Sequence, residues 1–216
     1  MVSMNELSTH LRYGRARETS ALVDQAIAEH CPAETIIKQG FLTGLEDLEK
    51  QHLRDDVQLK EVTLAMRALY RGIGQIRHVL EEAPKNPAGT VVIGTVEDDT
   101  EETQKNIIGI LMEGRGLEVV DLGTCVSTNG FIRAVKEKDA GAIVCSADLV
   151  TTMQGMKTLV QALVSAGLRE KIKVILTGRP VTERYCRLIG ADYYAPDAPS
   201  AAEMAFCAVN RAAVRV

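Results

Sequence analysis

The sequence predicts two parts with different folds, a bundle of α-helices followed by an open α/β domain built on a five-stranded parallel sheet. Three observations predict this division. Apolar residues recur at helical spacing up to about Glu82, a proline-rich stretch then interrupts the pattern, and short β-branched runs alternate with amphipathic segments after Thr90. With 216 residues, of which 46% are hydrophobic, the chain is long enough for two small domains or one large one.

The first part, residues 1–82, is predicted to be helical throughout. Apolar stripes at helical spacing fall on three successive segments, represented by Leu22 and Ile27, by Ile37 and Phe41, and by Leu69. No strand pattern fits here. Three or four helices that pack as a small bundle are therefore expected.

The linker is predicted at residues 83–89, which read Ala83-Pro-Lys-Asn-Pro-Ala-Gly89. Two prolines and a glycine within so short a stretch end a helix and favour turns. The second domain is then expected to occupy residues 90–216.

In the second domain each apolar run is followed by a helical segment, which gives five β-α units. Continuous apolar strands joined by helices indicate a parallel sheet with helices on both faces, and such sheets bind ligands at the carboxyl ends of their strands. The expected strands are Thr90–Val96, Leu117–Asp121, Ala142–Ser146, Lys173–Thr177 and Asp192–Ala195.

Composition excludes several classes of protein. A net charge of −4 without any basic run argues against nucleic-acid binding. No stretch approaches the roughly 20 apolar residues of a membrane span and the N-terminus has no signal-peptide pattern, so a cytoplasmic location is expected. The five cysteines are scattered and odd in number, which predicts reduced thiols rather than disulfides or a zinc site.

Common loop motifs are absent as well. The first strand is followed neither by G-x-G-x-x-G nor by a P-loop, so a dinucleotide or nucleotide phosphate site is not expected. The acidic loop Glu97–Glu102 resembles the aspartate loop of receiver domains, but the third strand lacks the required aspartate and the fifth lacks the lysine. Glu101 and Glu102 are expected at least to stabilise the N-terminus of the next helix.

Five segments match the motifs of a known family: Gly44–Leu48 in the helical part, and Gly94–Glu97, Val119–Gly123, Gly178–Thr182 and Gly190–Asp192 in the α/β part. With these motifs the chain resembles the corrinoid (vitamin B12-binding) proteins of the methanol, methylamine and methoxy-aromatic methyltransferase systems, and it is similar to the cobalamin-binding part of methionine synthase.

This resemblance implies a helical cap followed by a flavodoxin-like (Rossmann-like) B12-binding domain with cobalamin as its cofactor. It also implies a methyl-carrier subunit rather than an independent enzyme, with methyltransferase subunits as partners. A homodimer is left open.

The family signature D-x-H-x-x-G, whose histidine ligates cobalt from below, is incomplete in this chain. Asp99 is retained, but Glu101 stands at the histidine position and Gln104 at the glycine position. A carboxylate is a harder ligand than imidazole and would bring an unpaired charge to a confined face. Ligation of cobalt by a histidine at this position is therefore excluded.

The pocket for the nucleotide tail of the cofactor departs from the family too. Thr177-Gly178 replaces a Gly-Gly pair and Tyr193 replaces a small residue, so added side chains are expected to crowd the tail. Hydroxyl groups remain as hydrogen-bond partners. The predicted cofactor-binding residues are Asp99, Glu101, Gln104, Ser146, Thr151, Thr152, Thr177, Gly178 and Tyr193, with no catalytic residue and no metal ligand.

Three functions are compatible with these residues. The first is a working corrinoid methyl carrier, in which the cofactor does the chemistry and the protein buries and orients it. The second is a paralogue that has lost the cofactor and acts as an interaction or regulatory partner of a methyltransferase. The third is a sensor that uses the same crevice for another flat or acyl ligand.

Overall fold

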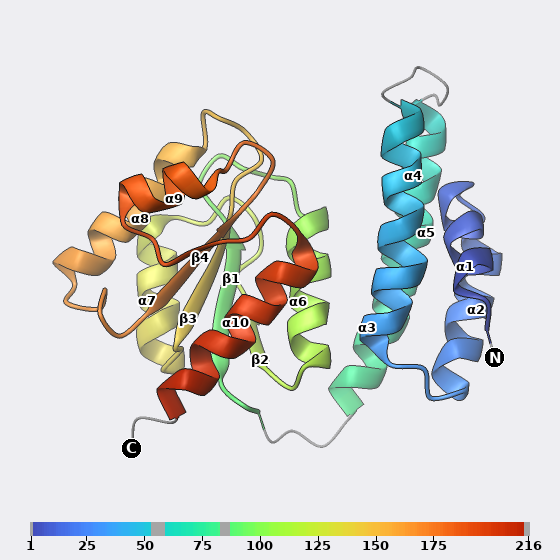
Figure 1. Cartoon of the computed structure of the whole chain (residues 1–216), viewed down its shortest axis with the longest axis horizontal. Helices are drawn as coiled ribbons and strands as arrows, with labels where there is room; N and C mark the ends of the chain where they lie inside the picture. The colour runs from blue at the N-terminus through green and yellow to red at the C-terminus, as the bar shows by residue number, and fades with distance from the viewer. Residues whose placement is uncertain (1, 53–58, 83–86, 214–216) are drawn as a thin grey trace. The chain divides into compact units, whose positions relative to one another are not determined.

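The structure is a computed structural model that describes residues 2–52, 59–82 and 87–213 (Figure 1). The chain divides into two compact units, Met1–Pro84 and Lys85–Val216. This division falls within the predicted linker, residues 83–89, whose first four residues lie outside the described part. No helix of the described ranges is long and apolar enough to cross a membrane.

The first unit is helical over its described residues, as predicted. Helix α2 packs along α5, and α1 packs against α2 and α4. Leu7, Leu11, Phe41 and Leu69 are completely buried between them. The helices are α1 (Met4–Arg12), α2 (Ala16–Ala28), α3 (Ala33–Thr35), η1 (Ile36–Leu42), α4 (Thr43–His52) and α5 (Leu59–Glu82).

One local feature of this unit was not expected from the sequence. The stretch η1 is a π-helix rather than an α-helix. Gly40 lies in it against the side chain of Leu7, and an added Cβ would overlap that side chain. The wider π-helical turn thus coincides with the close packing of α1 against Gly40. The helical spacing of apolar residues in the sequence does not distinguish this turn from an α-helical one.

The second unit contains a five-stranded parallel sheet in the order β2-β1-β3-β4-β5, which confirms the predicted α/β fold. Three predicted strands differ at their ends. Val96 lies beyond the first strand and forms a single bridge to Val126, Leu117 precedes the second strand, and the fifth strand is one residue shorter at each end. The strands are β1 (Thr90–Thr95), β2 (Glu118–Asp121), β3 (Ala142–Ser146), β4 (Lys173–Thr177) and β5 (Tyr193–Tyr194).

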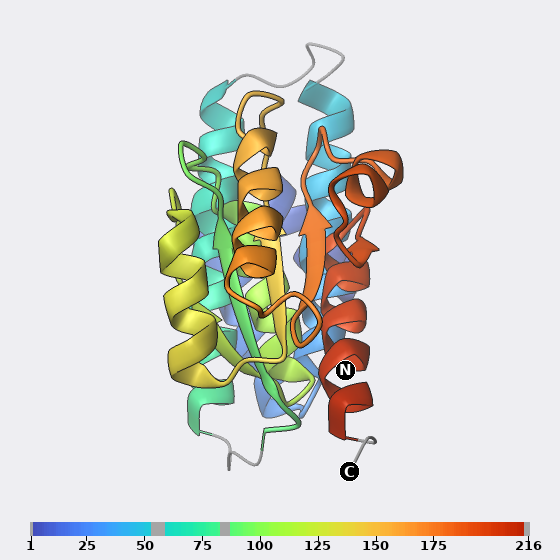
Figure 2. The ribbon, with the colours of Figure 1, turned by 90° about the vertical axis from the view of Figure 1, so that its left-hand side faces the viewer.

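Helices cover both faces of this sheet (Figures 1 and 2). Helices α6 and α10 lie side by side on one face, where α10 contacts β1, β3 and β4. On the other face α7, α8 and α9 bury a core that includes Phe131, Leu159 and Cys186. The helices are α6 (Thr103–Gly114), α7 (Thr128–Lys138), α8 (Met153–Ser165), α9 (Glu183–Ile189) and α10 (Ala198–Ala213).

The strand order reverses between β1 and β3. The chain passes from β1 to β2 on one side, and β3 then pairs with β1 on the other side. In open parallel sheets a ligand binds beyond the carboxyl ends of the strands at this reversal. The loops after β1, β3 and β4 are therefore the place to look for a site.

Candidate functional site

Three buried hydroxyl groups form a row across the carboxyl ends of β1, β3 and β4. Thr95 pairs in register with Ser146, and Ser146 pairs with Thr177. Their exposed fractions are 0%, 3% and 0%. Cys145 belongs to the core beneath α7, α8 and α9, so the alternation of side chains along a strand turns the row toward the face covered by α6 and α10.

Two of these hydroxyls have partners and the middle one has none. Thr95 Oγ1 donates to the carbonyl of Asp99 at 2.5 Å and accepts from the amide of Cys125 at 3.0 Å. Thr177 Oγ1 accepts from the side chain of Gln104. Ser146 Oγ makes no hydrogen bond within the described residues, and it is not among the fully buried atoms that lack a partner. Its oxygen therefore stays accessible and offers a donor and an acceptor to a polar ligand group.

The carboxylate of Asp99 joins the loop after β1 to the loop after β3, across the strand reversal. Oδ2 accepts from the amide of Asp148 at 2.6 Å and from Thr152 Oγ1 at 2.9 Å, and Oδ1 accepts from the amide of Glu101 at 3.1 Å. Asp99 is only 2% exposed. Three donors on a buried carboxylate compensate its loss of solvent, so Asp99 fixes both loops without any imidazole partner.

The charges of Asp99 and Asp148 act on two neighbours, the thiol of Cys145 and the guanidinium of Arg179. Burial raises the pKa of the Cys145 thiol above its ordinary range, and the negative charge of Asp99 raises it further. Asp148 forms an ion pair with Arg179, whose guanidinium Nη2 lies 2.8 Å from Oδ2. This pair ties the loop after β3 to the loop after β4.

Glu101 is used locally, at the start of α6. Its Oε1 accepts from the amide of Thr103 at 2.9 Å, which satisfies one of the free amides in the first turn. The predicted role at the helix N-terminus is thus confirmed for Glu101. Glu102 stands at the N-cap position but makes no side-chain cap.

The side chain of Gln104 spans the crevice from α6 to β4. Its Nε2 donates to Thr177 Oγ1 at 3.2 Å. Since β3 lies between β1 and β4, this hydrogen bond passes over the end of β3, where Ser146 lies. Two residues that were predicted to depart from the family pattern are therefore partners of each other.

Most of the predicted site residues meet at this edge of the sheet. Gly178 has φ of 126°, and a Cβ there would overlap the carbonyl oxygen of Ala147. Thr151 is exposed and takes no part in the described hydrogen bonds. Tyr193 pairs with Ile175 and so lies one row deeper than Thr177 on the same face. The residues brought together are Asp99, Glu101, Gln104, Ser146, Thr152, Thr177 and Gly178.

Two features of the site were missed in the sequence. Thr95 was not singled out, although it is the last residue of β1 as Ser146 and Thr177 are the last of β3 and β4. A predicted first strand that ended at Thr95 rather than Val96 would have shown that all three strands end in a residue with a hydroxyl group. The ion pair of Asp148 and Arg179 joins two loops distant in sequence, and no local pattern indicates it.

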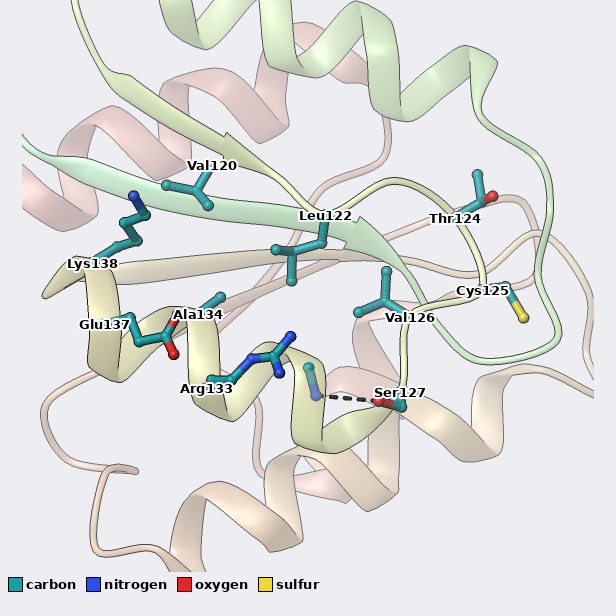
Figure 3. A pocket seen from close by; sticks show the side chains of 11 residues that line it. Val120, Leu122, Thr124, Cys125, Val126, Ser127, Arg133, Ala134, Glu137 and Lys138 are labelled. Carbon is teal, nitrogen blue, oxygen red and sulfur yellow. Dashed lines mark hydrogen bonds between the residues drawn. The ribbon is translucent and has the colours of Figure 1, made fainter.

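A separate hollow of about 370 Å³ lies between β2 and α7 (Figure 3). Val120, Leu122 and Val126 form an apolar floor, and the charged side chains of Arg133 and Lys138 lie at its rim. None of the predicted site residues lines it. It is therefore distinct from the crevice at the strand reversal.

The α/β unit that follows the helical unit presents polar groups at its strand reversal, as ligand-binding α/β proteins do. The sequence comparisons identify the family to which the chain belongs. The family model described as B12 binding domain matches residues 89–203, and a second model with the same description matches residues 4–77. The chain belongs to the B12-binding corrinoid proteins of the methylamine methyltransferase systems.

Relatives of similar length support this membership. The dimethylamine corrinoid protein of Methanosarcina barkeri is 35% identical over 182 residues, which cover 84% of this chain and 85% of the relative. The trimethylamine corrinoid protein of the same organism is 31% identical over 191 residues, covering 88% of each. The structure of the Methanosarcina barkeri monomethylamine corrinoid protein matches with a TM-score of 0.79 and 26% identity, covering 93% of this chain and 95% of that one.

The site fits a corrinoid in part. The ends of β1, β3 and β4 offer a rigid polar floor, and Asp99 fixes the loops around it. The α/β unit offers no imidazole for cobalt, because all four histidines precede residue 79. The site is therefore compatible with a corrinoid that is held without a histidine from this domain.

Proposed function

We propose that this chain is a corrinoid-binding methyl carrier of a methyltransferase system, in which no histidine of the α/β unit ligates the cobalt. Family membership supports corrinoid binding. The observation that carries the finer statement is the network of Asp99, whose oxygens are satisfied by Asp148, Thr152 and Glu101 rather than by an imidazole.

A bound corrinoid would supply the cobalt centre that accepts and gives up a methyl group. The chain's own residues provide position and surroundings. Asp99 holds the loops after β1 and β3 at a fixed separation, and Glu101 keeps its carboxylate at the start of α6. Since a carboxylate is a poorer cobalt ligand than imidazole, Glu101 would leave ligation of the cobalt to the cofactor's own base or to water.

The partners that this function needs are methyltransferase subunits, one to deliver the methyl group and one to receive it. The relatives named above are dimethylamine and trimethylamine corrinoid proteins, which favours a methylamine as the methyl source. A cytoplasmic location remains a prediction, and a homodimer is left open.

Reconstitution tests this function. Hydroxocobalamin is added to the full chain, unbound corrinoid is removed by desalting, and the visible spectrum and cobalt content are recorded. We expect a coloured protein with about one cobalt per chain, as one site predicts. Glu101→Leu, which removes the carboxylate, is expected to retain corrinoid as well. A colourless wild-type protein with no cobalt would contradict the proposal.

A second function is favoured by the hydrogen bond between Gln104 and Thr177, which closes the space over Ser146. In this alternative the chain has lost the cofactor and acts as an interaction or regulatory partner of a methyltransferase. It predicts that neither the wild type nor Glu101→His retains hydroxocobalamin. Retention only by Glu101→His would instead show an intact pocket that lacks its ligand.

A further inference from the structure

One side chain bridges α6 and the end of β4. Gln104 is the second residue of α6, and its amide reaches Thr177 at the last position of β4. The intervening strand, β3, ends at Ser146. The hydrogen bond of Gln104 therefore spans the carboxyl edge on the face where Ser146 stands.

Ser146, next to the Gln104 side chain, offers a hydroxyl group that can bind a polar group. Its residue is 3% exposed and its hydroxyl has no partner among the described residues. The hydroxyls on either side, those of Thr95 and Thr177, are already hydrogen-bonded. A ligand oxygen or nitrogen would satisfy Ser146, but the Gln104–Thr177 hydrogen bond stands across its approach.

Tyr193 lies on the same face of the sheet, beyond the far end of the hydroxyl row. It pairs with Ile175, one row below Thr177, on the side of β4 away from β3, and is half-buried. Gln104 is therefore the side chain that spans the row.

We propose that Gln104 is a specificity-determining residue that keeps the nucleotide tail of a bound corrinoid out of this crevice. The chain then selects the form in which the tail's own base stays on cobalt. This inference rests on the proposed function, because it concerns how a corrinoid is held. It needs no bond to form or break, since the cobalt–nitrogen bond that the free cofactor already has is kept.

Electron paramagnetic resonance of the Co(II) state tests this directly. The full chain is loaded with cobalamin whose benzimidazole carries nitrogen-15, and the cobalt is reduced by one electron. A nitrogen-15 ligand splits each cobalt line into a doublet, a nitrogen-14 ligand from a protein imidazole gives a triplet, and an oxygen ligand gives neither. We expect doublets from the wild type, because the base stays on cobalt.

The variants Gln104→Ala and Gln104→Gly remove the amide, and alanine also favours the helix. We expect them to lose doublet intensity in favour of the form without a nitrogen ligand. Gln154→Ala is the matched control, because Gln154 is the second residue of α8 and is exposed. It is expected to keep the doublets.

Affinity gives a second measurement. Cobinamide, a corrinoid without the nucleotide tail, and hydroxocobalamin should bind the wild type with dissociation constants within about threefold of each other, because the excluded tail makes no contacts. In Gln104→Gly hydroxocobalamin should gain up to about tenfold over cobinamide, the value of one or two net hydrogen bonds at Ser146 and Thr177.

The outcomes separate this inference from the proposed function. A wild type that binds corrinoid without doublets overturns the inference and leaves the carrier function standing. Retention by Gln104→Gly but not by the wild type supports Gln104 as the barrier and overturns the carrier function. Retention by neither protein overturns both.

Discussion

The side-chain amide of Gln104 lies 3.2 Å from the hydroxyl oxygen of Thr177, and it joins the first turn of α6 to the end of β4. The resemblance to the corrinoid family predicts glycine at both positions. Glycine has no side chain to fill this space, whereas the hydrogen-bonded side chains of Gln104 and Thr177 span it. The two substitutions therefore act on one space and have to be tested together.

Glu101→His combined with Gln104→Gly should restore a protein imidazole on cobalt, whereas Glu101→His alone should not. The single change adds the ligand but leaves Gln104 to hold the tail outside, so the cofactor's base keeps its position. In the double variant the base can leave, and nitrogen-14 triplets should replace nitrogen-15 doublets in the Co(II) spectrum. Triplets from Glu101→His alone would show that the two sites are independent.

Asp99→Ala should destabilise the protein by about 3 kcal/mol, because the amide of Asp148 and the hydroxyl of Thr152 lose a buried acceptor. Urea denaturation measures this change. Glu97→Ala is the control, since Glu97 is an exposed carboxylate of the same loop, and it should change stability by less than about 0.5 kcal/mol. Equal effects of the two substitutions would contradict the role of Asp99 in joining the loops after β1 and β3.

Gly178→Ala should cost about 3 kcal/mol or more. The backbone of Gly178 has φ of 126°, and the new Cβ would overlap the carbonyl oxygen of Ala147. Gly74→Ala should have the opposite effect and stabilise the protein by about 1 kcal/mol. Gly74 lies in α5 with open space around it. Thermal denaturation of the two variants distinguishes strain at Gly178 from a general preference for alanine.

Thiol reactivity should separate the cysteines by burial. Cys125 is exposed and should react first with a disulfide reagent, whereas Cys145 and Cys186 are buried and should react only on unfolding. The substitution Cys125→Ser should remove the fast phase and leave the slow one. Fast labelling that survives this substitution would mean that another thiol is accessible.

Stability should fall at high pH through the buried thiol of Cys186. Burial raises its pKa from 9.0 to about 11, so the unfolded chain loses this proton first. The stabilising contribution is fully present below about pH 9 and is lost as the pH rises to about 11. Urea denaturation across this range should show a weaker decline in Cys186→Ala. The same slope in both proteins would assign the decline to other groups.

The sequence was sufficient to predict the two folds and the positions of β3 and β4, because uninterrupted apolar runs and the proline-rich linker are strong local signals. It was also sufficient to place Asp99 and Glu101 after β1 and Gln104 at the start of the next helix. The π-helical stretch at Ile36–Leu42 could not be predicted, since it coincides with the contact of Gly40 with Leu7 across the bundle.

Interactions between residues far apart in the sequence could not be predicted either, because they also depend on three-dimensional contacts. Gln104 and Thr177 were each recognised as departures, but their hydrogen bond depends on the sheet order, which brings α6 near β4. The unpartnered hydroxyl of Ser146 could be identified only from three-dimensional contacts. Thr151 was predicted at the site by its neighbours in sequence, yet it is exposed and outside the described network.

Equilibrium dialysis of the full chain against hydroxocobalamin tests the central claim most directly, because it measures corrinoid binding without assuming a ligand or a partner. One bound corrinoid per chain, with Glu101→Leu binding as tightly as the wild type, is the result that this account predicts. No bound corrinoid in the wild type, or binding that is lost in Glu101→Leu, would contradict it.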